Sequence, residues 1–370
     1  KTYYPKEFIA ASMTMDISNQ NKLSEFYEEL KRLKIEIVRP DINECFEDFR
    51  TDGKKFFYAL GAIKAVGYEA ISNIVEERIK NGKFISLNDF LNRVNPKNLN
   101  KLQLEGLVKA GAFDNLNSNR KSLFLSIPNF IIKSKNIFEN KTANQIDLFG
   151  ETTNQDNELL TNTKDWQFEE RLSKEFEAVG FFISDHPLNQ YKEIFEDYKI
   201  SDFQSFNNDD DSKSSNMAAT LLKIQERKTS KGNSYAVLKL TDLNSVFELF
   251  IFSEVLEQNR DILKEGNSFI LTLIKSFSDG ENRFKRINVQ KIASLKEVLN
   301  KPINEVTFKL KSLKELDELS KFLINKGDTL ININFNDKNN SVDFQLKNKR
   351  NIDRKTINLL RNKEISAIIR

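Results

Sequence analysis

Apolar residues recur at helical spacing through the first half of the chain. Leu23, Tyr27 and Leu30 lie three or four positions apart, and Ile71 and Ile74 belong to a second stripe of the same kind. This spacing places apolar side chains on one face of a helix. Glycines interrupt the stripes, so we predict short helices joined by loops in this half, including residues 1–60.

Beyond Met217 the apolar residues alternate with polar ones, which is typical of half-buried strands. The predicted strands are Ala218–Gln225, Ser234–Leu240, Val246–Phe252, Phe269–Lys275 and Phe284–Ile292, with a helix at Glu254–Leu263. Three strands, a helix and two strands form the order expected of an OB-fold β-barrel. The polar stretch Asn207–Asn216, which has no apolar residue, predicts a linker before it.

A small mixed unit is predicted at the C-terminal end. Its strands are Glu305–Leu310, Thr329–Phe335 and Val342–Leu346, and its helices are Leu313–Leu323 and Arg354–Leu360. The predicted fold class is therefore a multi-domain α+β chain with a helical half, a β-barrel and a small α+β domain.

The composition limits the kinds of site that the chain can hold. Hydrophobic residues make up 39% of the sequence and phenylalanine contributes 30 residues, which is enough for sizeable cores. The net charge is only +3, so a basic surface for nucleic acid must be local. The single cysteine, Cys45, excludes an internal disulfide and favours a reducing, cytoplasmic setting. The single histidine, His186, excludes a multi-histidine zinc site.

The hydropathy of the chain and its first residue lead to two further expectations. No apolar run approaches the length of a membrane helix. The sequence opens with Lys1 and without an initiator methionine, and we interpret it as a fragment of a longer chain.

A set of motifs in one order makes the sequence more specific than any single motif does. They are YYPKEFIAASMTMDI, FFYALGAIKAVGYEAISNIVEER, LNKLQLEGLVKAGAFD, NQIDLFG and EFEAVGFFISDHPL, followed by the predicted barrel. In this combination the chain resembles the alpha subunit family of bacterial DNA polymerase III, the C-family replicative polymerases, over nearly its whole length and least after residue 300.

The resemblance implies a division of the chain and a place for catalysis. It assigns residues 1–55 to part of the fingers domain, 56–142 to a helix-hairpin-helix DNA-binding region, 143–150 to a clamp-binding motif, 151–215 to a linker and helical segment, 216–295 to the OB-fold, and 296–370 to an α+β domain for docking an accessory subunit such as the clamp loader. The palm domain, with the carboxylates that bind Mg²⁺, would lie before residue 1. We therefore expect no catalytic residue, no metal and no cofactor in this chain, and no polymerase activity from it alone.

The stretch Leu60–Tyr68 resembles a helix-hairpin-helix turn. In that motif, glycines allow a tight turn, and free N–H groups at the start of the second helix bind a phosphate oxygen without reading bases. Ala65 stands where the pattern has its first glycine, and a plain helical turn is the alternative. The predicted duplex-binding residues are Lys64, Val66, Gly67, Tyr68, Lys101 and Lys109.

A wider basic surface is predicted around the last two of these lysines. Its cations are Lys97, Lys101, Lys109, Arg120, Lys121, Lys133, Lys135 and Lys141. Cations against duplex phosphates give binding that depends on salt and not on base sequence. A solvated helical face is the alternative interpretation.

A short peptide between the basic helices and an acidic stretch resembles the clamp-binding pentapeptide of bacterial polymerases. Its residues are Gln145, Ile146, Asp147, Leu148 and Phe149. Two adjacent apolar anchors on an exposed peptide can enter a pocket, and the glutamine adds a hydrogen bond. The resemblance therefore implies that the sliding clamp is a partner.

The predicted barrel carries cations and rings of the kind that bind single-stranded DNA. The predicted contacts are Arg227, Lys228, Lys231, Tyr235, Lys239, Arg283, Phe284 and Lys285. Phe250 or Phe252 could add a ring, but Phe247, Leu249 and Ile251 compete with them for the inside of the barrel, and the sequence leaves the choice open.

Two tempting catalytic clusters are set aside. His186 follows Asp185 in SDHPL, a stretch that the resemblance places in a structural turn, and Asp41–Glu44 falls in the implied fingers. Two other classes remain open: a complete DNA-binding adaptor without catalysis, and, more remotely, an aminoacyl-tRNA synthetase with an accessory OB domain.

Overall fold

The computed structural model describes residues 3–98, 100–142, 159–230, 232–277, 285–337 and 340–369. Contacts divide the chain into two compact units, Lys1–Pro187 and Leu188–Arg370. None of the helices in the described ranges has the length and apolar character needed to cross a membrane.

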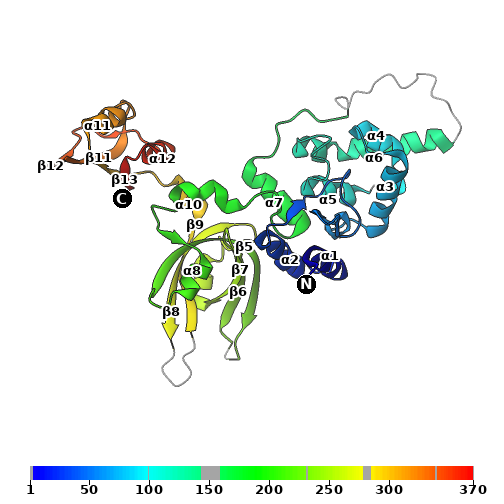
Figure 1. The fold of residues 1–370 in the computed structure, drawn as a ribbon, viewed down its shortest axis with the longest axis horizontal. Helices are drawn as coiled ribbons and strands as arrows, with labels where there is room; N and C mark the ends of the chain where they lie inside the picture. The colour runs from blue at the N-terminus through cyan, green and yellow to red at the C-terminus, as the bar shows by residue number, and fades with distance from the viewer. Residues whose placement is uncertain are drawn as a thin grey trace. The chain divides into compact units, whose positions relative to one another are not determined.

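The first unit is mainly helical (Figure 1). Its helices are α1 (Pro5–Met15), α2 (Gln20–Arg32), α3 (Tyr68–Asn81), α4 (Leu87–Arg93), α5 (Lys101–Ala110), α6 (Arg120–Thr142) and α7 (Phe168–Val179), with 3₁₀ turns η1 (Leu60–Ala62) and η2 (Pro96–Asn98). Capping residues at the ends of the helices explain where the helices start and stop. Asn100 and Gln103 form a capping box at the start of α5, and Gly111 ends that helix with a φ of 83°.

The prediction that residues 1–60 are only helices and loops is wrong in one place. A three-stranded sheet is formed by β1 (Glu36–Val38), β2 (Arg50–Thr51) and β3 (Lys55–Phe57), in the order β1-β3-β2. Strands of two or three residues are too short for an alternating pattern to stand out in the sequence.

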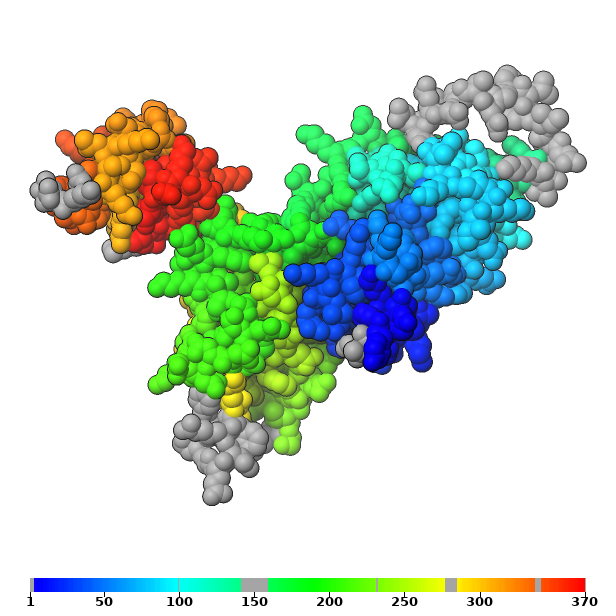
Figure 2. All heavy atoms as spheres, viewed as in Figure 1, coloured from blue at the N-terminus to red at the C-terminus, as the bar shows by residue number. Residues whose placement is uncertain are grey.

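One apolar core runs through the whole first unit. It includes Ile9 of α1, Phe56 of β3, Leu107 of α5 and Val179 of α7, all buried. In Figure 2 the blue and cyan parts of this unit lie directly against each other. The predicted boundary between residues 55 and 56 therefore does not separate two cores, and α7, which falls in the predicted 151–215 linker and helical segment, belongs to this unit.

The second unit contains a curved sheet whose five long strands match the predicted runs (Figure 1). They are β5 (Ser214–Lys228), β6 (Ser234–Thr241), β7 (Val246–Phe252), β8 (Ser268–Phe277) and β9 (Lys285–Ser294), in the order β7-β6-β5-β8-β9, all antiparallel. The predicted helix is α9 (Ser253–Asn259), between β7 and β8. A short sixth strand, β4 (Ile200–Ser201), pairs parallel with β5. Three short helical elements pack around the sheet: η4 (Pro187–Ile194), α8 (Phe203–Asn208) and α10 (Leu295–Asn300).

The C-terminal part of this unit is a mixed sheet covered on one face by helices. Its elements are β10 (Glu305–Leu310), α11 (Leu313–Ser320), β11 (Lys326–Asp337), β12 (Asn340–Gln345), α12 (Arg354–Asn362) and β13 (Ser366–Ile369), with strand order β12-β11-β10-β13. Phe308 and Ile331 of the sheet share a core with Leu319 of α11 and Leu360 of α12. The predicted elements are confirmed here, and β13 is an additional strand.

Candidate nucleic-acid interface

The predicted hairpin is a tight turn between η1 and α3. Ala65 has a φ of +62°, the left-handed conformation that glycine adopts most easily. The alanine therefore takes the conformation that the glycine pattern requires, at a cost of about 1–2 kcal/mol for an L-residue. Gly67 then precedes α3, whose first residue is Tyr68. The turn is not the plain helical turn that the sequence left open.

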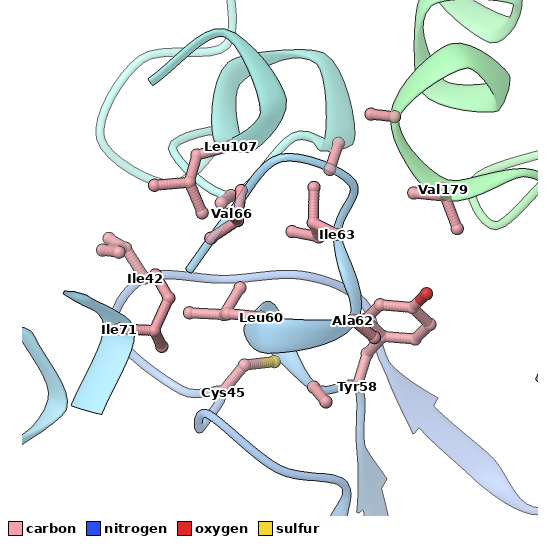
Figure 3. Packing of buried hydrophobic residues seen from close by; sticks show 14 of the residues in the cluster. Ile42, Cys45, Tyr58, Leu60, Ala62, Ile63, Val66, Ile71, Leu107 and Val179 are labelled. Atoms are coloured by element: carbon pink, nitrogen blue, oxygen red, sulfur yellow. The ribbon is translucent and has the colours of Figure 1, made fainter. Parts of the chain in front are cut away.

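Residues distant in sequence hold this turn in place. The N–H of Lys64 donates to the carbonyl oxygen of Ala178, at the end of α7, over 2.9 Å. From the other side, Gly106 of α5 lies so close that a Cβ there would be 2.9 Å from the carbonyl oxygen of Lys64. Val66 is buried next to Leu107 of α5 (Figure 3). The turn thus depends on packing against α5 and α7.

Two of the three predicted backbone donors remain available. The N–H of Val66 donates to the carbonyl oxygen of Ile63 over 3.1 Å, so its predicted role as a free donor is wrong. Within the part of the chain that the structure describes, the N–H groups of Gly67 and Tyr68 have no protein acceptor. Both residues are exposed, and the first N–H groups of a helix attract anions.

The side chains around these donors are of both signs. The hydroxyl of Tyr68 donates to the carboxylate of Asp48 over 3.1 Å, and this hydrogen bond raises the pKa of Tyr68. Lys64 is exposed beside the turn. Lys101 is exposed at the start of α5, 3.8 Å from the carboxylate of Glu105. The Tyr68 side chain is therefore already paired with an acid, whereas Lys64 adds an exposed cation to the turn.

Lys109 and Arg120 serve the packing of the first unit more than its surface. Lys109 pairs with Glu177 over 3.1 Å and its side chain is only 19% exposed. Arg120 is buried and donates to the carboxylates of Asp114 and Glu175 over 2.7 and 3.4 Å, so its predicted place on the basic surface is wrong. Glu175 also accepts the N–H groups of residues 183 and 184, which ties α6 to the segment after α7.

The remaining predicted cations differ in how far they reach solvent. Lys97 and Lys135 are exposed, whereas Lys121 and Lys133 are half-buried. Lys141, Lys231, Arg283, Phe284 and the whole clamp-binding motif, Gln145 to Phe149, lie outside the residues whose side chains the structure describes.

Strand β7 settles which rings face outward from the sheet of the second unit. Phe247, Leu249 and Ile251 are buried in the core, whereas Phe250 is 50% exposed and Phe252 is 59% exposed. Glu248 shares the outward side of the strand with the two exposed rings, because side chains alternate along a strand. That single charged residue was the signal in the sequence that could have chosen between the two sets.

Cross-strand pairing continues this outer face onto β6 and β5. Phe252 pairs with Tyr235, which in turn pairs with Arg227, so a ring, a second ring and a cation lie in one row. Lys228 is exposed at the end of β5. Lys239 is only 9% exposed, so it does not present the accessible cation that was predicted.

A groove lies between β7 and β9, which are far apart in sequence. Its volume is about 780 Å³. It is lined by Phe203, Asn207, Glu248, Leu249, Phe250, Phe252, Ser276, Lys285, Arg286, Ile287 and Asn288. The groove therefore combines two exposed rings with two cations, the chemistry that single-stranded nucleic acid requires.

The groups set aside as catalytic candidates have structural surroundings. Asp41 is buried and accepts the N–H of Asn43 over 2.6 Å and the amide of Asn115. The N–H of His186 donates to Asp185 over 2.7 Å in the turn after α7. Burial raises the pKa of Cys45 to about 12, so this thiol is no nucleophile at neutral pH. The described residues contain no group of three or more His, Cys, Asp or Glu side chains that could hold a metal.

Comparisons with known proteins agree with this geometry. A family described as "Helix-hairpin-helix motif" matches residues 34–123, which include η1, the left-handed turn, α3 and α5. The chain is 32% identical to DNA polymerase III subunit alpha of Borreliella burgdorferi over 370 residues, covering 94% of the chain and 31% of that protein. The corresponding protein of Campylobacter jejuni is 32% identical over 363 residues, covering 88% of the chain and 29% of the protein. That of Escherichia coli is 30% identical over 287 residues, covering 75% and 24%. The chain thus spans less than a third of the length of these relatives.

Proposed function

Because the chain belongs to the DNA polymerase III alpha-subunit family, we propose that it contributes DNA-binding and partner-docking surfaces to a replicative DNA polymerase. The observation that carries this proposal is the hairpin turn, with Ala65 at positive φ and exposed, available donors on Gly67 and Tyr68. Backbone donors bind phosphate regardless of base sequence, as a replicative enzyme requires.

Duplex binding at the hairpin is tested by charge reversal next to the turn. We expect Lys64→Glu combined with Lys101→Glu to weaken binding of a duplex oligonucleotide and to flatten the log–log salt dependence by about 0.9 for each phosphate that the variant no longer binds. Lys80→Glu combined with Lys54→Glu is the matched control, because it reverses the same number of charges at two exposed lysines outside the turn. Equal effects of the double variant and the control in fluorescence anisotropy would show that only the net charge matters.

Single-strand binding is proposed for the second unit. The pairing order of β5 to β9, with α9 between β7 and β8, supports an OB-fold, and β7 and β9 border the groove. Phe250 and Phe252 would stack on bases while Arg286 and Lys285 bind phosphates. Arg227 and Tyr235 extend the same face.

Clamp docking is proposed for Gln145–Phe149 from the sequence pattern. Helix α6 ends at Thr142, three positions before this motif. Beyond the motif, the N–H of Thr161 donates to the hydroxyl of Ser126 in α6 over 2.8 Å. Replacing Leu148 and Phe149 by alanine should weaken binding to a purified sliding clamp by about 2–4 kcal/mol. Unchanged affinity in a calorimetric titration would contradict the assignment, and Asn154→Ala in the following polar stretch is the control.

Polymerisation is proposed only for the longer protein of which this chain would be a part. Two Mg²⁺ ions held by palm carboxylates would supply that chemistry, and we assign none of these ligands to the present chain. A primer extension assay with this chain, Mg²⁺ and nucleotides should therefore give no product. Residues 296–370 are proposed as the docking site for an accessory subunit.

A further inference from the structure

The groove of the second unit has an acidic segment at its edge. This segment, residues 207–213 with the sequence NNDDDSK, comprises the last two residues of α8 and the five residues that lead to β5. It holds three consecutive aspartates, and Asn207 itself lines the groove. Carboxylates beside a site for phosphates oppose binding, because like charges repel.

A buried lysine anchors the acidic segment to the barrel. Lys275 of β8 is 5% exposed and its ammonium group donates to the carbonyl oxygens of Phe206 and Asp209. The ammonium nitrogen also lies 4.1 Å from the centre of the Phe206 ring. The N–H of Lys275 donates to the carbonyl oxygen of Lys213 over 2.9 Å. Contacts near both ends of the acidic segment therefore define its position.

From this position the acidic segment reaches a cation of the groove. The ammonium group of Lys285, on β9, lies 3.1 Å from the carboxylate of Asp210 and also donates to the carbonyl oxygen of Asn207. The side chain of Asp210 is 71% exposed, whereas that of Lys285 is 30% exposed. The ion pair can therefore open to solvent without disturbing the core.

We propose that Asp210 is an autoinhibitory contact that occupies Lys285 and competes with the backbone phosphates of a single strand entering the groove. The proposal rests on the proposed single-strand binding at Phe250 and Phe252. A strand must displace the carboxylate before Lys285 can bind a phosphate, so short or weakly bound strands are disfavoured relative to strands that also stack on both rings.

A double-mutant cycle tests this competition directly. The full chain is titrated with fluorescent oligo-dT at several salt concentrations as wild type, Asp210→Asn, Lys285→Met and the double variant. We expect Asp210→Asn to bind roughly 2- to 5-fold more tightly at low salt, the scale of one exposed ion pair. Its log–log salt slope should be steeper by about 0.7, because one more phosphate is bound. In the Lys285→Met background, Asp210→Asn should have no effect.

Two further variants separate the possible failures. Asp211→Asn changes the charge equally and is the matched control, because no contact joins Asp211 to Lys285 among the described interactions. The proposal is overturned if Asp211→Asn strengthens binding as much as Asp210→Asn does, or if the gain from Asp210→Asn persists without Lys285. Either result would mean that the acidic segment weakens binding only through its overall negative charge. If Phe250→Ala with Phe252→Ala weakens binding while Asp210→Asn changes nothing, the groove binds the strand but the inhibitory contact is wrong. If the two phenylalanine substitutions have no effect, the proposed single-strand site and the inhibitory contact both fail.

Discussion

The hairpin of the first unit and the groove of the second unit present their proposed binding groups in two different ways. At the hairpin the donors are backbone N–H groups, and their positions depend on Ala178 and Gly106, which are far away in sequence. In the groove the binding groups are side chains, and the strand beneath them is held by the opposite, buried face. A backbone site should therefore be sensitive to changes in the core, whereas a side-chain site can lose its function without losing its fold.

The largest effect is expected from the buried ion pair behind the hairpin. Replacing Glu175 by alanine leaves the buried charge of Arg120 with one carboxylate fewer and removes the acceptor of two backbone N–H groups. We expect the free energy of unfolding of the first unit to fall by about 3–5 kcal/mol. Denaturation followed by circular dichroism measures this loss, and duplex binding should weaken with it.

The matched control for this change lies two residues further along α7. Glu177 is 44% exposed and pairs with Lys174 and Lys109. Its replacement by alanine should cost about 1 kcal/mol or less. Equal losses for Glu175→Ala and Glu177→Ala would mean that the buried pair does not support the hairpin.

The groove should show the opposite behaviour. Replacing Phe250 and Phe252 by alanine removes two exposed rings, each expected to contribute about 1–3 kcal/mol to single-strand binding by stacking on a base. Oligo-dT affinity should fall while the melting temperature and duplex binding stay close to those of the wild type. Leu249→Ala, on the buried side of the same strand, should instead lower stability. A large loss of stability from the two phenylalanine substitutions would show that these rings belong to the core.

The close approach of α5 to the hairpin predicts a smaller effect for a substitution at Gly106. The sign of the change in the free energy of unfolding tests whether the approach is close. A Cβ at Gly106 would lie 2.9 Å from the carbonyl oxygen of Lys64 and 3.0 Å from Val66. We expect Gly106→Ala to destabilise the first unit by about 1–3 kcal/mol and to weaken duplex binding. Without the clash, alanine would stabilise the helix by about 1 kcal/mol, so a gain in stability would contradict the close approach. Leu102→Ala, at an exposed position of α5, is the control.

The smallest effect is expected at Ala65. Glycine there removes the cost of positive φ, about 1–2 kcal/mol, but loses part of that gain through the larger entropy of the unfolded chain. Ala65→Gly should therefore raise the free energy of unfolding by up to about 1 kcal/mol and leave duplex affinity unchanged or slightly higher. A clear loss of stability would mean that the turn is not left-handed at this residue.

The local pattern of the sequence was sufficient to predict much of the architecture. Strand β7 was predicted with its observed bounds, and the helices of the first half were expected from their apolar stripes. These elements follow from the spacing of apolar residues, which can be recognised over a few neighbouring positions of the chain. The glycine pattern located the hairpin even though Ala65 replaces one glycine, because the residues on both sides keep their spacing.

Tertiary structure decided which of the predicted residues reach solvent. Arg120 and Lys239 have the charge of binding residues but are covered, because a charge in the sequence does not reveal what packs over it. The pairing of Lys285 with Asp210 joins residues 75 positions apart, and no local pattern encodes that contact. The sequence by itself determined most of the elements and the chemistry available to them, but not the short strands β1, β2, β3 and β13. Only the folded chain determined which groups face one another, because pairing and burial depend on contacts between distant segments.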